Sequence, residues 1–224
     1  LQTKSDRRGA VRETAPPEWL WRDAPAEPRP PRPLAPSAAP DDDAPDPPPG
    51  PDARAAAQRG KLLHALFERL PEVPEDERRA VADRWLDRSA GIADASLRGG
   101  LIDDACRVIS HPDFADLFGP GALAEAPIAA VVAGGHVVSG TVDRLLVTDE
   151  RIVVADFKTG RSVPADPSDI PVPHLRQMAF YVAALRIIFP ERAVEAALLY
   201  TSGPRLHWLP EELLAPFAPA AALA

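Results

Sequence analysis

Apolar residues recur along the chain with two different periods. The first period is helical: four residues spaced three or four positions apart predict a helix from about residue 53 that ends before Pro71, namely Leu63, Leu66, Phe67 and Leu70. Residues 75–89 and 101–110, with a short turn at 114–118, continue this pattern. The globular part of the chain therefore begins with a layer of helices.

The period shortens after residue 127. Valine-rich segments at 128–132 and 137–147 predict two antiparallel strands joined by a turn at Gly134-Gly135. The remaining elements are expected in this order: a strand at 152–158, a helix at 174–189, a strand at 194–201 and an edge strand at 205–209. This order predicts an α/β fold with a central mixed sheet, which contains an antiparallel three-strand meander and is flanked by helices.

Proline divides the chain into two parts. Of 28 prolines, 14 lie within residues 1–51, where no apolar period is sustained. We therefore expect a proline-rich linker over residues 1–52 and a globular domain over residues 53–224. The chain begins at Leu1 and not at a methionine, which favours a fragment of a longer protein.

Composition excludes several classes of protein. The net charge of −8 argues against a free-standing electrostatic DNA-binding protein, although acids that hold metal ions would fit it. The single cysteine, Cys106, cannot form an internal disulfide or a four-cysteine metal site. No phosphate-binding loop for ATP occurs. No apolar run approaches the roughly 20 residues of a membrane helix, and no leader is recognisable, so we expect a cytoplasmic protein without a membrane partner.

The second and third predicted strands bring three charged residues together. If Asp149-Glu150 forms a two-residue turn, Asp143 lies opposite Asp156, at a distance of about 5 Å. Lys158 shares this face, and it is one of three lysines against 22 arginines. Because the third strand is apolar on both faces, a solvated surface ion pair is a poor explanation. A hard divalent cation such as Mg²⁺ would satisfy both acids.

Four segments resemble motifs of a known family: Asp156-Phe157-Lys158-Thr159 after Asp143, Gly60 to His64, Gly140 to Arg144, and Gln177 to Tyr181. Over residues 55–209 the chain resembles the RecB-type domain of the PD-(D/E)xK nuclease superfamily. The resemblance is greatest to the carboxyl-terminal nuclease domain of the AddA subunits of bacterial AddAB helicase-nucleases. Trp19-Leu20 and Pro33 to Ser37 resemble the tether that joins such a domain to its helicase. The resemblance implies a restriction-endonuclease-like core.

The resemblance also implies roles for individual residues. The metal ligands would be His64, Asp143, Asp156 and the Phe157 carbonyl, with Mg²⁺ as the ion and Mn²⁺ as a substitute. The catalytic residues would be Asp143, Asp156, Lys158, Gln177 and Tyr181, and Gln177 and Tyr181 would also contact DNA. Glu125, placed before the first strand, would support the metal site. Taken without the resemblance, His64 fits a packed boundary residue, and Gln177 with Tyr181 fits ordinary helix packing.

The function that follows is a metal-dependent DNA exonuclease acting on single strands that a helicase delivers. Its setting would be double-strand break repair and recombination in the bacterial cytoplasm, with association with the nucleoid during repair. Its partners would be single-stranded DNA, the helicase portion of the same polypeptide and an AddB-like subunit. Two alternatives stay open: a catalytically silent module for DNA binding or assembly, and a metal-free scaffold in which Lys158 bridges two acids. His174 is interpreted as a helix cap.

Overall fold

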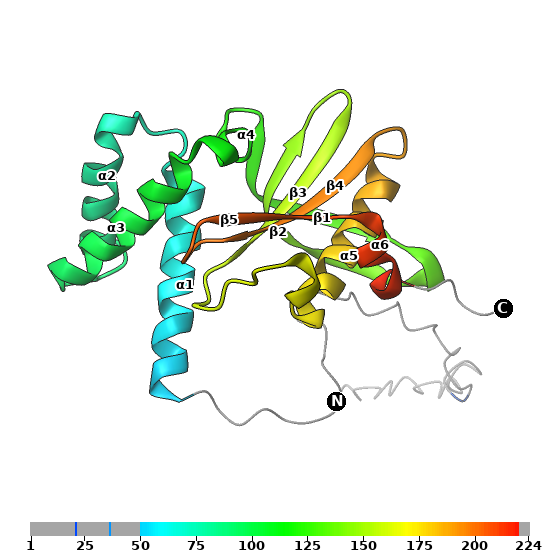
Figure 1. Cartoon of the computed structure of the whole chain (residues 1–224), viewed down its shortest axis with the longest axis horizontal. Helices are drawn as coiled ribbons and strands as arrows, with labels where there is room; N and C mark the ends of the chain where they lie inside the picture. Colours follow the sequence, from blue (N-terminus) through cyan, green and yellow to red (C-terminus); the bar gives the residue numbers. More distant parts are fainter. Residues whose placement is uncertain (1–20, 22–35, 37–49, 220–224) are drawn as a thin grey trace, which may run out of the picture. The chain divides into compact units, whose positions relative to one another are not determined.

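The computed structural model describes residues 21, 36 and 50–219 (Figure 1). The chain divides into two compact units, Leu1–Pro30 and Pro31–Ala224, and Trp21 is the described residue of the first unit. The linker predicted over residues 1–52 lies almost wholly outside the described residues and stays a prediction. Among the helices that are described, none has the length and apolar character needed to cross a membrane.

Four helices precede the sheet: α1 (Pro51–Arg69), α2 (Glu75–Arg88), α3 (Ala95–Ile109) and the short α4 (Ala115–Phe118). Pro51 begins α1, where a missing backbone N–H costs nothing, and Pro71 lies just beyond its end. Helix α3 begins six residues before its predicted start, because the Asp94 side chain accepts hydrogen bonds from the Ser96 and Leu97 amides and caps it.

The sheet contains five strands in the order β1-β2-β3-β4-β5. Their bounds are β1 (Ala122–Val131), β2 (Val137–Val147), β3 (Arg151–Lys158), β4 (Ala193–Tyr200) and β5 (Arg205–Leu209). Strands β3 and β4 pair in parallel, and every other neighbouring pair is antiparallel. Helix α5 (Val172–Ile188) makes the crossover from β3 to β4, and the short α6 (Glu211–Leu214) follows β5. This confirms the predicted mixed sheet with its three-strand meander.

Each face of the sheet has its own apolar core. Val153, Ala155 and Phe157 of β3 pack with α1–α4, whereas Ile152 and Val154 pack with α5 (Figure 1). The prediction that β3 is covered on both faces is therefore confirmed. Asp156 follows the alternation of Ile152 and Val154, so this acid points to the α5 side of the sheet.

The predicted register of the β2–β3 hairpin is confirmed for four residue pairs, but the predicted pair of Asp143 with Asp156 is not part of the ladder. Val147 pairs with Ile152, and the ladder continues to Arg144 opposite Ala155. Thr148 and Arg151 close the turn through hydrogen bonds between the Thr148 side chain and the Arg151 backbone. The ladder ends one position before Asp143 and Asp156, which leaves their carboxylates at the open end of the hairpin.

Strand β1 is longer than the sequence predicts. It begins at Ala122, whereas the valine-rich pattern begins only at residue 128. Residues 122–127 have weak strand propensity and include Pro127, which cannot donate to a ladder. Because β1 is an edge strand that pairs with β2 alone, it tolerates this proline. The placement of Glu125 before the first strand is therefore wrong: Glu125 lies within β1.

Helix α1 approaches the end of β3 closely at Gly60. A Cβ at this position would lie 2.6 Å from the Thr159 Oγ1 atom and 3.7 Å from the Thr159 Cβ atom. We expect Gly60→Ala to lower the free energy of unfolding by about 1–2 kcal/mol, because the overlap outweighs the gain in helix propensity. In a Thr159→Ala background the same substitution should raise stability by up to about 1 kcal/mol. Thermal denaturation of the four proteins measures both effects, and the same sign in both backgrounds would contradict this packing.

Candidate functional site

Residues of α1, β2, β3 and α5 converge at the carboxyl end of β3. They surround a cavity of about 510 Å³. Its lining contains all the sequence-predicted site residues except Glu125, together with further groups: Pro36, His64, Thr141, Asp143, Asp156, Phe157, Lys158, Pro173, His174, Arg176, Gln177 and Tyr181. The carboxyl ends of parallel strands are a common location for ligand sites in open α/β sheets.

Asp143 of β2 is held by two contacts. Its Oδ1 atom lies 3.2 Å from the His64 Nδ1 atom on α1, and its Oδ2 atom accepts a hydrogen bond of 2.6 Å from the Phe157 amide. The Phe157 amide is available because the β2–β3 ladder has already ended. The carboxylate thus replaces a backbone acceptor at the strand end, and this fixes its position.

Asp156 and Lys158 form a buried ion pair. The Lys158 Nζ atom lies 2.7 Å from the Asp156 Oδ2 atom and donates a second hydrogen bond of 2.7 Å to the Gln177 Oε1 atom. Burial raises the pKa of Asp156 to about 6, the charge of Asp143 adds to this rise, and Lys158 opposes it. Without a further cation, ionised Asp156 is therefore a costly group in this cavity.

Gln177 and Tyr181 orient the lysine from α5. The Tyr181 hydroxyl donates to the Thr141 carbonyl at 3.0 Å, and the Gln177 amide nitrogen lies 3.5 Å from that hydroxyl. Since the amide nitrogen faces Tyr181, the amide oxygen faces Lys158. Burial raises the pKa of Tyr181 to about 12, which keeps the phenol a neutral donor. Contact of either residue with DNA stays a prediction.

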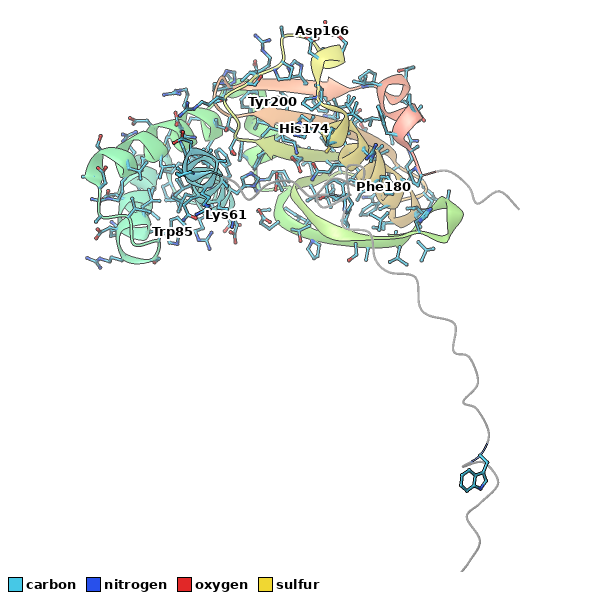
Figure 2. The ribbon with its side chains drawn as sticks, turned by 90° about the horizontal axis from the view of Figure 1, so that it is seen from below. Lys61, Trp85, Asp166, His174, Phe180 and Tyr200 are labelled. Atoms are coloured by element: carbon cyan, nitrogen blue, oxygen red, sulfur yellow. The ribbon has the colours of Figure 1, made fainter. Side chains whose placement is uncertain are left out.

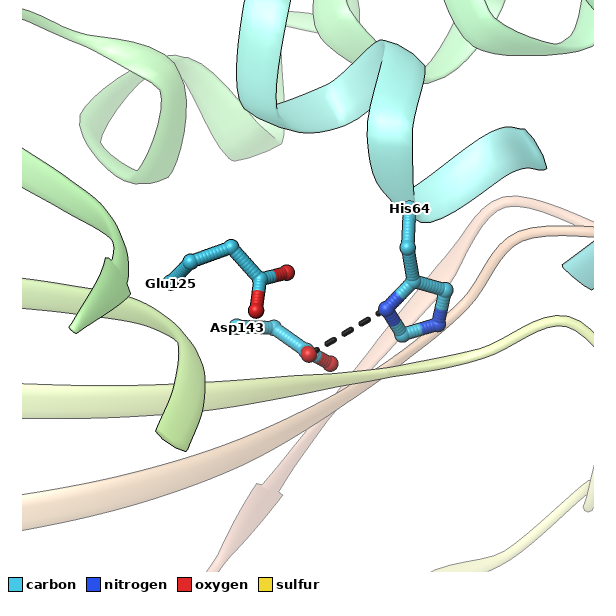
Figure 3. Close-up of side chains that lie close together, drawn as sticks. All are labelled: His64, Glu125 and Asp143. Carbon is cyan, nitrogen blue, oxygen red and sulfur yellow. Dashed lines mark hydrogen bonds and ion pairs between the residues drawn. The ribbon is translucent and has the colours of Figure 1, made fainter. Parts of the chain in front are cut away.

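Glu125 joins His64 and Asp143 in a second cluster (Figure 3). One ligand atom from each residue lies within 4.8 Å of the others. Glu125 has a φ of +47°, the one positive φ among the described residues other than glycine. Such a conformation costs on the order of 1 kcal/mol or more and occurs often at functional sites. Burial, together with the negative charge of Asp143, raises the pKa of Glu125.

His64 experiences two opposing effects. Burial alone would lower its pKa, but the hydrogen bond and the charge of Asp143 outweigh burial, so its pKa is raised. The ring also packs edge-on against Phe157, with centroids 5.7 Å apart. The negative potential of the neighbouring acids therefore favours a cation at this position.

The donor set fits a divalent cation. Carboxylates suit Mg²⁺ and Mn²⁺, and an imidazole is a better ligand for Mn²⁺ than for Mg²⁺. Asp143 belongs to both groups of acids, since it contacts His64 and lines the cavity of Asp156. His64, Glu125 and Asp143 would hold the ion, with Asp156 and Phe157 on the neighbouring wall of the cavity.

Arg144 connects α1 and β1, the two elements that carry His64 and Glu125. Its guanidinium donates to the Phe67 carbonyl on α1 and to the Ala122 carbonyl on β1, the latter at 3.4 Å. It also lies over the Phe118 ring, 5.1 Å from the centroid. Burial lowers the pKa of Arg144. Because α1 carries His64 and β1 carries Glu125, Arg144 fixes the two elements that complete the cluster around Asp143.

Two residues of the cavity were not predicted to be there. His174 is the third residue of α5 and not its cap, since the N-cap position belongs to Pro171 (Figure 2). Burial, together with the charge of Lys158, lowers the pKa of His174 to about 4, and its Nδ1 atom lies 3.5 Å from the Tyr200 hydroxyl. From the sequence alone, a histidine at the start of a helical pattern could equally cap the helix or lie in its first turn and face the cavity.

Pro36 is the second unexpected residue. It is buried, belongs to the unit Pro31–Ala224 and lines the cavity of about 510 Å³. A Cβ at Gly140 of β2 would lie 3.3 Å from the Pro36 Cδ atom and 3.6 Å from the Tyr181 ring. The glycine inside an otherwise valine-rich strand was the available signal, because such glycines often mark a close approach of another group.

Comparison with known proteins identifies one family. The model of the PD-(D/E)XK nuclease superfamily matches residues 41–213, which include His64, Glu125 and Asp143 and every residue that lines the cavity except Pro36. Comparison with curated proteins gives no match. Among solved structures, one titled "Crystal structure of SSO0001" is similar at 16% identity, with 73% of this chain and 82% of that chain covered and a TM-score of 0.33. A TM-score this low supports no further statement.

The raised pKa of Asp156 predicts a stability effect with a defined sign. The folded protein binds this proton up to about pH 6, against an ordinary value of 3.8, so metal-free protein loses stability as pH rises through that window. At pH 8 without metal, Asp156→Asn should melt at a higher temperature than the wild type. The gain should be at most about 3 kcal/mol, at about 1.4 kcal/mol per pKa unit.

The difference between Asp156→Asn and the wild type should narrow below about pH 4. Asp149→Asn, in the exposed turn of the same hairpin, is the matched control and should show no pH-dependent difference. Thermal melts across pH in EDTA measure both variants. A variant less stable than the wild type at pH 8 would contradict the unfavourable burial of Asp156.

Proposed function

The chain belongs to the PD-(D/E)XK nuclease superfamily, and from this premise we propose that it is a divalent-metal-dependent deoxyribonuclease that hydrolyses phosphodiester bonds. The observation that carries the proposal is that Lys158, Asp143 and Asp156 line one cavity, with Lys158 paired to Asp156. Two acids and a lysine at the ends of adjacent strands form the motif for which this superfamily is named.

Lys158 has one donor left for the reaction. An ammonium carries three N–H bonds, of which one is directed to Asp156 and one to Gln177. The third can donate to a phosphate oxygen or to the attacking water in the cavity. Since Asp156 and Gln177 fix the direction of the first two bonds, the position of the third is set before a substrate arrives.

The acids hold the cation and orient the reacting groups. His64, Glu125 and Asp143 supply a compact donor set, and Asp156 accepts from Lys158 so that the ammonium stays at the cavity wall. A bound divalent ion would polarise a phosphate oxygen and lower the pKa of a coordinated water. The His174 imidazole, whose pKa burial lowers to about 4, and the Tyr181 ring also line the cavity.

We further propose that the chain is the nuclease domain of an AddA-type subunit, acting as an exonuclease on single-stranded DNA in double-strand break repair. The motifs from Gly60 to His64, Gly140 to Arg144 and Gln177 to Tyr181 support this proposal through their resemblance to such subunits. Its partners would then be a helicase portion of the same polypeptide and an AddB-like subunit, in the bacterial cytoplasm and, during repair, at the nucleoid. A helicase that delivers the strand would compensate for the net charge of −8.

Substitution of the central residues tests the nuclease proposal. Asp143→Ala and Lys158→Ala should each reduce Mg²⁺-dependent cleavage of labelled single-stranded DNA by at least about 100-fold, because each removes charge stabilisation of the transition state. The melting temperature measured in Mg²⁺ should stay within a few degrees of the wild type. Asp149→Ala, on the same hairpin, is the matched control and should cut normally. Full activity in either site variant would refute the assignment.

Removal of the metal separates the nuclease from its alternatives. EDTA should abolish cleavage, and Mg²⁺ or Mn²⁺ should restore it, with tighter binding of Mn²⁺ because of the imidazole ligand. Calorimetric titration should detect ion binding in the wild type and not in Asp143→Ala. Ion binding without cleavage would favour a silent binding module, whereas no ion binding would favour a scaffold in which Lys158 bridges the acids.

A further inference from the structure

The cavity that holds the acids and Lys158 shares lining residues with two others. On the α1 side it shares His64 and Asp143 with a cavity of about 500 Å³. On the side of the β3–α5 loop it shares Phe157, Lys158 and His174 with a cavity of about 540 Å³. The two outer cavities also have Thr159 in common. We refer to these three neighbouring cavities, which lie around the carboxyl end of β3, as the groove.

Each outer cavity contains one exposed cation that has no partner among the described residues. Lys61 of α1 lines the first, and Arg161, just after β3, lines the second (Figure 2 labels Lys61). Within the part of the chain that the structure describes, neither forms a hydrogen bond or an ion pair. By contrast, seven other arginines that the structure describes are paired with acids, namely Arg59, Arg69, Arg79, Arg98, Arg107, Arg151 and Arg186.

The charges of the groove have a simple order. Acids and the candidate cation site occupy the centre, where His64, Glu125 and Asp143 meet, and Lys61 and Arg161 line the two outer cavities. Glu68 and Asp169 also line the outer cavities, but Glu68 is paired with Arg69. In a chain with a net charge of −8, a polyanion can be held only by such local cations.

The groove is also recessed. Asp156 is 6% exposed, and Lys158 and Gln177 lie beside it in the cavity wall. A phosphate must therefore enter the recess to reach them. One flexible strand can bend into it, whereas the stacked duplex carries its phosphates on the outside of a rigid rod.

From this arrangement we propose that Lys61 and Arg161 bind the phosphates on the two sides of the cleaved bond, so that a single strand of nucleic acid crosses the groove from α1 to the β3–α5 loop. This proposal rests on the proposed nuclease function and adds the path of the substrate. Lys61 supplies a compact point charge, and Arg161 can donate two parallel hydrogen bonds to one phosphate. Neither residue takes part in the chemistry, so both act on binding of the strand.

The salt dependence of binding tests the path. Fluorescence anisotropy with a fluorescein-labelled oligothymidylate, in Ca²⁺ and between about 50 and 200 mM salt, gives the slope of log affinity against log salt concentration. Lys61→Gln and Arg161→Gln should each reduce the magnitude of this negative slope by about 0.7, because each removes one phosphate contact. Each should also weaken binding about fivefold near 0.1 M salt. In the double variant the magnitude of the slope should fall by about 1.4.

The matched controls are Arg84→Gln and Arg88→Gln. These exposed cations of α2 also have no hydrogen bond or ion pair among the described residues, and they line none of the three cavities. Their slopes and affinities should equal those of the wild type. Equal losses in all four single variants would overturn the path, since they would reflect only the overall charge. No loss in Lys61→Gln or Arg161→Gln, or no binding by the wild type, would also overturn it.

A duplex of the same sequence separates the strand types. The duplex should bind the wild type more weakly than the single strand does, and its affinity should not fall further in the double variant. A duplex that binds as tightly as the single strand, and loses as much affinity in the double variant, would contradict the single-strand path. Cleavage by the wild type in Mg²⁺ is measured in parallel. Cleavage with unchanged slopes would reject the path and keep the nuclease function, whereas altered slopes without cleavage would keep the path and reject the nuclease function.

Discussion

The repulsion between Asp143 and Asp156 is the constraint on which the rest of the site depends. Two buried carboxylates at the end of one hairpin destabilise the fold unless nearby groups compensate them. The Phe157 amide and His64 contact Asp143, and Lys158 contacts Asp156. The Phe157 amide and Lys158 belong to β3 of the hairpin itself, whereas His64 comes from α1, so groups from inside and outside the hairpin hold the two acids. The two carboxylates thus lower the stability of the metal-free protein, and a divalent cation bound between them would restore it.

The two cores of the domain have separate tasks at this site. The core on the α1 side fixes α1 and β1 through Arg144, and so it positions His64 and Glu125. The core on the α5 side fixes α5 against β2 through the bond from Tyr181 to the Thr141 carbonyl, and so it positions Gln177. The sheet end lies between them. The donor set for the cation and the orientation of the lysine are therefore set independently, one from each face of the sheet.

Much of this arrangement could be predicted from the sequence, for definite reasons. The valine-rich hairpin has one turn that suits it, and side chains alternate strictly along a strand, so the register of Val147 with Ile152 followed. Tertiary context decided the rest. The early residues of β1 have no strand signal of their own and become a strand because β2 offers an edge. The turned backbone at Glu125 and the inward position of His174 depend on neighbours far along the chain, which no local pattern contains.

Pro36 changes where this domain should be considered to begin. The family match starts at residue 41, and the first helix starts at Pro51, yet Pro36 already lies in the cavity wall against the space left by Gly140. A fragment cut at either of those later points would keep every charged group of the site and lose part of the surface that encloses them. The segment that folds by itself and the segment that encloses the cavity completely thus begin at different residues. An excised domain can fold and still lack part of the cavity wall.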